Sequence, residues 1–159
     1  MSSDYFIKIT KIEGESKADG HVNEIDVQSW SWGVSNSTSV AVGTGLGKGK
    51  ANPSDLSFMH VYDKASPVLA SFCAKGTHID EIKLTGRKSG EGQQDYLIIT
   101  LTGAFITSVQ ASGSSGGDVM ESVSCAFKKL KIEYKMQDTA GKMTNGPEFT
   151  WDVEANKVS

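Results

Sequence analysis

The sequence predicts a mainly β protein, a small antiparallel β-barrel of roughly eight strands with one short helix at about residues 67–75. Apolar and polar residues alternate with a period of two in most apolar segments, as expected for strands buried on one face. The gaps between these segments are rich in Gly, Ser, Asn and Asp, which tolerate turn conformations. One segment combines helical spacing with start and stop signals.

The strands follow from the alternation in chain order. Near the N-terminus, Ile7 and Ile9 flank Lys8, and near the C-terminus, Phe149 and Trp151 follow the same rule. We therefore expect strands at residues 5–9, 25–34, 56–61, 79–87, 97–102, 105–111, 121–136 and 149–153.

Two of these strands change phase partway. In the second strand, apolar residues are odd-numbered up to Val27 and even-numbered from Trp30. In the seventh, the change falls between Phe127 and Leu130. Such a change requires an extra residue or burial on both faces. It is typical of long strands that turn a corner in a small barrel or orthogonal sandwich, and equally of a strand that leaves its own core to meet a partner. The sequence leaves both interpretations open.

The helix has signals at both ends. Ser66 is the expected N-cap, Pro67 suits the first helical position, and Lys75 belongs to the last turn. Gly76 then suits the C′ position. Its apolar face, which we expect to cover one open end or side of the barrel, consists of Leu69, Phe72 and Cys73.

Length and composition restrict the possible functions. A chain of 159 residues predicts a single domain, residues 1–159, with a core that needs neither disulfide nor metal. A net charge of −3 gives no electrostatic reason to bind nucleic acid. The apolar stretches are far shorter than the roughly 20 residues of a membrane span, and the N-terminus lacks the pattern of a secretory signal. Cys73 and Cys125 are expected to be small buried hydrophobic residues.

A glycine-rich segment at residues 43–50 invites comparison with a phosphate-binding loop. The P-loop pattern ending at Lys50 requires glycine at position 44 and Ser or Thr at position 51. The sequence has Thr44 and Ala51 there, and no helical pattern follows. We therefore interpret the segment as a connecting loop rather than a nucleotide site.

Catalytic and metal motifs are equally incomplete. Residues 113–117 formally match G-x-S-x-G around Ser115, but a serine hydrolase needs a histidine later in the chain, and the last one is His78. No histidine has a partner at i+4 or a nearby cysteine pair, so zinc is unsupported. The sequence therefore predicts no catalytic, cofactor-binding or metal-binding residue, and no enzyme.

A series of short motifs in fixed order is distinctive. They are Phe6–Ile9, Gly14–Lys17, His21, Glu24–Val27, Ser29–Gly33, the glycine loop, Asp55–Phe58, Asp63–Pro67, Cys73–Gly76, Tyr96–Ile99 and Glu121–Val123. The series resembles the haemolysin-coregulated protein family, the inner-tube subunit of the bacterial type VI secretion system. The resemblance extends over essentially the whole chain, from about residue 4 to about residue 155.

The resemblance implies a compact β-barrel whose copies form homo-hexameric rings, and rings that stack into a tube. A contractile sheath surrounds the tube, a spike protein caps its tip, and contraction expels it. Family members carry small effectors in the channel. They are in the bacterial cytoplasm before firing and are then secreted or delivered into target cells, without a cleaved signal. Some members carry a C-terminal toxin domain, and this chain resembles the plain form because it ends at Ser159.

The resemblance also assigns expected roles to residues. An extended loop at about residues 35–53 is expected to contact the next ring through Gly43, Thr44, Gly45, Leu46, Gly47 and Lys48. Ser31 is expected to face the channel, and Ser89, Gly90 and Lys157 are expected near the ring rims. No membrane insertion and no nucleic-acid partner are expected.

Two alternatives stay open at this point. A monomeric ligand-binding β-barrel fits the small barrel and its tryptophans, and it predicts a monomer with an enclosed apolar cavity. A serine hydrolase using Ser115 predicts ester hydrolysis that is lost in Ser115→Ala.

Overall fold

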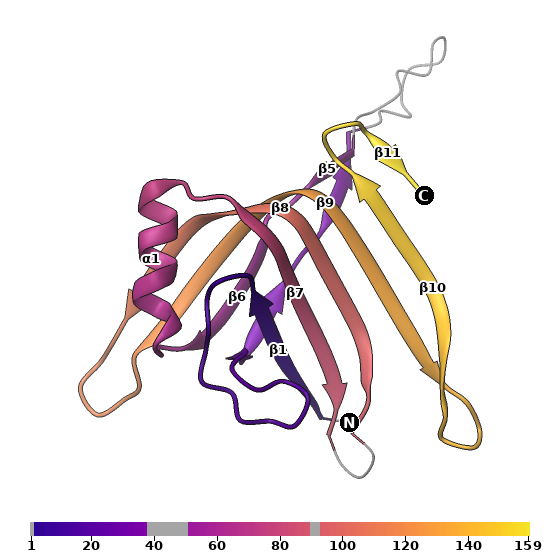
Figure 1. Ribbon diagram of the computed structural model, residues 1–159, viewed down its shortest axis with the longest axis horizontal. Helices are drawn as coiled ribbons and strands as arrows, with labels where there is room; N and C mark the ends of the chain where they lie inside the picture. The colour runs from indigo at the N-terminus through magenta and orange to yellow at the C-terminus, as the bar shows by residue number, and fades with distance from the viewer. Residues whose placement is uncertain (1, 38–50, 90–92) are drawn as a thin grey trace.

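The computed structural model describes residues 2–37, 51–89 and 93–159 (Figure 1). Within these ranges the chain is mainly antiparallel β-structure with a single helix, which confirms the predicted fold class. The elements are β1 (Ser3–Ile9), β2 (Ile25–Val27), β3 (Ser29–Ser31), β4 (Val34–Asn36), β5 (Ala51–Pro53), β6 (Leu56–Val61), α1 (Ala65–Lys75), β7 (Ile79–Lys88), β8 (Asp95–Ser112), β9 (Met120–Gln137), β10 (Met143–Asp152) and β11 (Lys157–Val158).

The strand pairings run in a circuit. β1 pairs with β2 and β7, β7 with β8, β8 with β9, β9 with β6, and β6 with β3. β2 and β3 are consecutive segments separated by Gln28, whose amide donates to the carbonyl oxygen of Met59 at 2.8 Å. The circuit therefore closes through this bent segment, as expected for a small antiparallel barrel.

The sheet continues past β9 on the edge opposite β8, and we define the flange as residues 131–137 of β9 together with β10 and β11. The second half of β9 pairs with β10, and β10 pairs with β11. β10 runs along the outer side of β9 and away from the circuit (Figure 1).

The observed strands differ from the predicted ones in several places, among them β10, which begins at Met143 rather than at residue 149, and β11, which was not predicted. The predicted strand 25–34 is interrupted, because β2 pairs with β1 whereas β3 pairs with β6. The predicted strands 97–102 and 105–111 form the single strand β8. The two ends of the predicted loop, β4 and β5, pair with each other as a two-stranded ladder.

Both phase changes have a local explanation. The first falls at Gln28, where the chain exchanges one partner strand for another. The second lies in β9 opposite Gly103 of β8, which has a φ of 65°. A register shift follows between Ile106 and Ser108, so Thr107 is an extra residue in the ladder. Glycine tolerates the left-handed backbone, and the bulge bends the strand pair.

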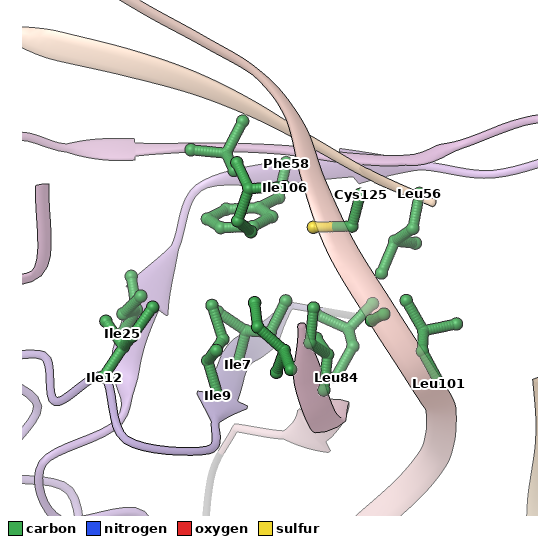
Figure 2. Packing of buried hydrophobic residues seen from close by; sticks show 14 of the residues in the cluster. Ile7, Ile9, Ile12, Ile25, Leu56, Phe58, Leu84, Leu101, Ile106 and Cys125 are labelled. Carbon is green, nitrogen blue, oxygen red and sulfur yellow. The ribbon is translucent and has the colours of Figure 1, made fainter. Parts of the chain in front are cut away.

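The core lies inside the circuit and is built from the inward positions of its strands (Figure 2). Alternate residues of each strand point to the same side of the sheet, and those that point inward are mostly aliphatic. Its fully buried large members include Ile7, Ile25, Leu56, Phe58, Leu69, Ile79, Ile82, Leu84, Ile99, Leu101 and Leu130.

The helix begins two residues earlier than predicted and packs against β8. Asp63, rather than Ser66, accepts the hydrogen bond of a first-turn amide, from Ala65 N to Oδ1 at 2.9 Å. Ser66 lies inside the helix, and its Oγ accepts a hydrogen bond from the amide of Asp63 at 3.1 Å. This reciprocal arrangement satisfies amides at the helix start. The predicted C-terminus is confirmed, since Gly76 has a φ of 64°.

The two cysteines should differ sharply in reactivity. Both are free thiols, and burial raises the pKa of Cys125 to about 12, which keeps its thiol protonated. Cys73 on α1 is half-buried. We expect a thiol reagent such as Ellman's to label Cys73 in the folded protein and Cys125 only after denaturation. Cys73→Ser should abolish the native-state signal, and rapid labelling of that variant would contradict the expectation.

Candidate functional site

A row of serines crosses four strands at one level of the sheet. Successive cross-strand pairing brings Ser31 of β3 opposite Ser57 of β6, and Ser57 opposite Ser124 of β9. Ser124 is in turn opposite Ser108 of β8. The Oγ atoms of Ser57 and Ser124 are 2.9 Å apart and share a hydrogen bond.

A second row follows two residues along each strand and therefore lies on the same face. It consists of Ser29, Met59, Ser122 and Gln110, in register across the same four strands. A shallow surface depression of about 220 Å³ lies over the two rows, and Ser29, Ser31, Ser57, Met59 and Ser122 contribute to its lining. We call these two rows the serine face.

The serine face points away from the core because of what lies between its rows. Trp30, Phe58, Val123 and Val109 are in register with one another on the opposite side of the sheet. All of them belong to the core or pack against it. Since successive residues of a strand alternate between the two faces, the serines are left outward.

The chemistry of the serine face is hydrogen bonding without charge. Its two rows contain six serines, one methionine and one glutamine, and no ionisable side chain. Each hydroxyl can donate or accept a hydrogen bond, so the surface accommodates either polarity in a contacting molecule. It offers no nucleophile activated by a neighbouring base.

Each histidine lies beside a carboxylate, and Ser115 takes part in none of these contacts. His60 Nε2 and Glu121 Oε1 are 2.7 Å apart in the core, His21 lies between Glu24 and Asp95, and His78 is 3.5 Å from Asp80. Ser115 lies in an exposed turn between β8 and β9. Within residues 2–37, 51–89 and 93–159, no group of three His, Cys, Asp or Glu side chains could hold a metal ion.

The buried pair has a third member at the start of α1. Asp63 Oδ1 is 3.9 Å from His60 Nδ1. Burial raises the pKa of the Asp63 carboxyl above its usual value, and the amide of Ala65 and the nearby His60 partly oppose this shift. The cluster therefore ties β6, β9 and the helix start together in a low-dielectric environment.

The predicted site residues are distributed over the molecule. Ser31 is exposed on the serine face, and Lys157 is exposed on β11. Ser89 is half-buried, and its Oγ donates to the carbonyl oxygen of Ser2 at 2.8 Å. Figure 1 places β11 at the opposite end of the molecule from the C-terminal end of β7, which Ser89 directly follows in the chain. Gly90 and the loop residues 43–48 lie outside the described residues.

Of the serine face, the sequence predicts only Ser31 as a functional residue. The others, Ser29, Ser57, Ser108, Ser122 and Ser124, carry a weak signal, since serine recurs at a spacing of two in β3 and β9.

Comparison with known proteins decides the family. The family model described as "Type VI secretion system effector, Hcp" matches residues 6–134. The chain belongs to the Hcp family. It is 48% identical over 159 residues to protein hcp1 of Pseudomonas aeruginosa, with 98% of each chain covered.

Solved structures of Hcp proteins have the same fold. Hcp1 of Salmonella typhimurium is 36% identical, with a TM-score of 0.81 and full coverage of both chains. A structure described as a type six secretion system protein has a TM-score of 0.93 at 31% identity, and the alignment covers 99% of this chain and 100% of that one. As a member of the Hcp family, the chain is a secreted tube protein of type VI secretion. Within the described ranges, no helix combines the length and apolar character of a membrane span.

Proposed function

We propose that this Hcp protein forms hexameric rings that stack into the inner tube, with the serine face turned to the channel. The observation that carries the proposal is an uncovered apolar surface on the flange. Tyr134 and Met136 are 45% and 46% exposed, and they follow the half-buried Ile132 on the same face of β9. Phe149 of β10 lies opposite Ile132 and extends this surface.

Ring closure requires two different complementary surfaces on each subunit, because the contacts in a cyclic assembly of more than two copies are heterologous. The apolar flange supplies one of them. Exposed apolar patches on soluble proteins commonly mark such contacts. A neighbouring subunit that covers Tyr134 and Met136 would bury this surface.

The serine face suits the wall of a channel for protein cargo. Uncharged hydroxyls can exchange hydrogen bonds between water and a passing surface without selecting one sign of charge. We therefore propose that small effectors are carried against this face. Expulsion of the tube would follow from contraction of a surrounding sheath, with a spike protein at the tip. The subunit would thus be cytoplasmic before firing and be delivered outside the cell afterwards.

The ring contacts proposed from the sequence complete this assembly. We propose that residues 43–48 bind the next ring, and that Ser89, Gly90 and Lys157 lie near the two rims. The positions of Ser89 and Lys157 at opposite ends of the subunit support this assignment.

The decisive experiment is a charge placed on the flange. Met136→Glu should abolish rings while leaving the thermal unfolding midpoint within a few degrees, because a half-exposed side chain contributes little to the monomer fold. Light scattering and negative-stain images of purified protein measure the assembly. Ser57→Gln on the serine face is the matched control and should keep its rings.

Two results would contradict the proposal. Rings that persist in Met136→Glu would show that the flange is not the contact surface. A wild-type protein that stays strictly monomeric at high micromolar concentration would favour the monomeric ligand-binding barrel instead.

A further inference from the structure

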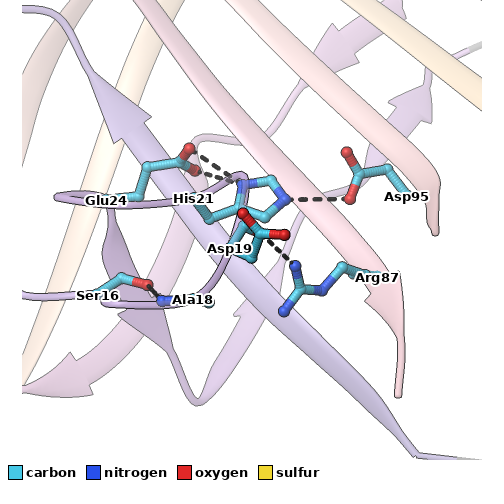
Figure 3. A network of polar contacts seen from close by, with 7 residues as sticks. All are labelled: Ser16, Ala18, Asp19, His21, Glu24, Arg87 and Asp95. Carbon is cyan, nitrogen blue, oxygen red and sulfur yellow. Dashed lines mark hydrogen bonds and ion pairs between the residues drawn. The ribbon is translucent and has the colours of Figure 1, made fainter. Parts of the chain in front are cut away.

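A second site lies in the loop between β1 and β2, separate from the serine face. His21 is only 6% exposed, and both of its ring nitrogens face carboxylates (Figure 3). Nδ1 is 3.0 Å from each carboxylate oxygen of Glu24, and Nε2 is 3.1 Å from Oδ1 of Asp95. The histidine thus connects its own loop to the first residue of β8.

Three further contacts meet at the same place. The ring of His21 stacks on Phe6 of β1, with centroids 4.4 Å apart and an angle of 4° between the planes. The Arg87 guanidinium lies 5.0 Å from the centre of the same phenyl ring. Arg87 Nη1 also donates to the carbonyl oxygen of Asp19 in the loop at 2.7 Å. The loop is therefore held to β1, β7 and β8 together.

The two strand residues involved lie at the turn end of the β7–β8 hairpin. Arg87 of β7 and Asp95 of β8 are cross-strand partners. The loop binds one through Asp19 and the other through His21. Loss of the contact between His21 and Asp95 would leave the loop bound to this end of the hairpin through Arg87 alone of the two.

The number of protons on His21 decides how many of these contacts can form. A neutral imidazole has one N–H and one lone pair, whereas the protonated ring has two N–H donors. Ionised carboxylates can only accept hydrogen bonds. The protonated ring therefore bonds to Glu24 and Asp95 at once. The neutral ring bonds to one of them and directs a lone pair at the other.

Other charged groups at this place are Arg87 on β7 and Asp19 in the loop, with Asp4 of β1 opposite Arg87 in the ladder. Arg87 bonds to the backbone oxygen of Asp19 rather than to the imidazole, so it contributes to the electrostatic field at the ring, while Glu24 and Asp95 are the hydrogen-bond partners of its nitrogens. His60 differs, since only its Nε2 is hydrogen-bonded. His78 differs too, because it is half exposed.

We propose that His21 is a pH-sensitive clamp that fixes the turn end of the β7–β8 hairpin to the loop at residues 10–24. The clamp is closed when the imidazole carries two protons and releases either Glu24 or Asp95 when it carries one. It is a property of the single subunit. Its consequence for assembly, a ring rim whose rigidity depends on pH, rests on the function proposed above.

The test is hydrogen exchange by mass spectrometry on the full-length protein at pH 5.5 and pH 8.5, corrected for intrinsic rates. Peptides covering residues 12–24 and 93–97 should lose protection by about tenfold at the higher pH, since one charge-assisted hydrogen bond is lost. A core peptide covering residues 97–106 should not change. Equal protection at both pH values in the two clamp peptides would overturn the proposal.

Glu24→Gln gives the sharper comparison. The glutamine amide can donate a hydrogen bond to unprotonated Nδ1, while Nε2–H still donates to Asp95. The neutral ring then satisfies both neighbours, so this variant should keep its protection at pH 8.5. His78→Gln should behave as wild type. Protection in Glu24→Gln that falls as much as in wild type would exclude the clamp.

Repeating the exchange on Met136→Glu separates the clamp from the ring. The same pH-dependent loss in a monomeric variant supports a device within the subunit, even if the proposed assembly fails. A loss seen only in assembled wild type would overturn the clamp and indicate a contact between subunits.

Discussion

Glu121→Ala should destabilise the protein by about 3–5 kcal/mol, because it leaves a cavity in the core and deprives the buried His60 imidazole of its hydrogen-bond partner. His60 is 0% exposed and Glu121 is 1% exposed. Each group loses its hydrogen bonds to water when it is buried, and the 2.7 Å contact between the two side chains replaces one of them. After the substitution, the nearest acidic group to the imidazole is Asp63 at 3.9 Å. Urea denaturation followed by tryptophan fluorescence measures the change.

A double substitution separates the pair from its surroundings. His60→Phe together with Glu121→Leu removes both polar groups and fills similar volume. The double variant should therefore lose less free energy of unfolding than His60→Phe and Glu121→Leu lose together, by about 1–3 kcal/mol. Glu133→Ala on the flange, a more exposed carboxylate beside Lys131, should change stability by no more than about 0.5 kcal/mol. Strict additivity in the cycle would show that the two side chains contribute independently.

His60 and Glu121 also show which features of the structure can be predicted from the sequence and which cannot. His60 and Glu121 occupy inward positions of two alternating strands, next to the cross-strand pair of Phe58 and Val123 on the core side. A polar residue at an inward position is a visible anomaly in a period-two pattern. That the two residues meet, however, depends on the pairing of β6 with β9, and no local pattern specifies a pairing so distant in the chain.

The strands themselves were predictable because burial on one face imposes alternation wherever a strand lies on the core. The interruption at Gln28 was visible as a phase change, but its cause was not, since a bulge and a change of partner give the same pattern. At the second phase change, Gly103 and Thr107 bend β8 within the core. Beyond it, β9 continues to the exposed Tyr134 and Met136, and contact of this end with a partner stays a prediction.

The serine face and the helix start were missed for a related reason. Ser31, Ser57 and Ser124 come from three separate strands, and only the register of those strands aligns them. At the helix start, both Asp63 and Ser66 are good capping residues. The backbone turn places Asp63 at the amide of Ala65, and Ser66 then bonds back to Asp63.

Gly14→Ala should be nearly as damaging as loss of the buried pair, at about 2–4 kcal/mol. A Cβ on Gly14 would lie 2.5 Å from the carbonyl oxygen of Glu24 and 2.8 Å from the Cα of Ile25. Both atoms belong to the backbone, so no side-chain rotation relieves the overlap. The segment must move away from β2, which breaks the hydrogen bonds from Gly14 N to Asn23 O and from Ser16 N to Glu24 O.

Gly33→Ala is the matched control, because its nearest neighbour would be Ser54 Oγ at 3.9 Å and its φ lies outside the left-handed region. Alanine there should be neutral or stabilise slightly, by about 0.4–1 kcal/mol, since it restricts the unfolded chain. Urea denaturation of both variants under identical conditions measures the contrast. Equal stability in the two would mean that the loop beside β2 moves without cost. In that case Glu24 would not be held firmly enough to position His21, because the Gly14 and Ser16 contacts are what fix the backbone on either side of Glu24.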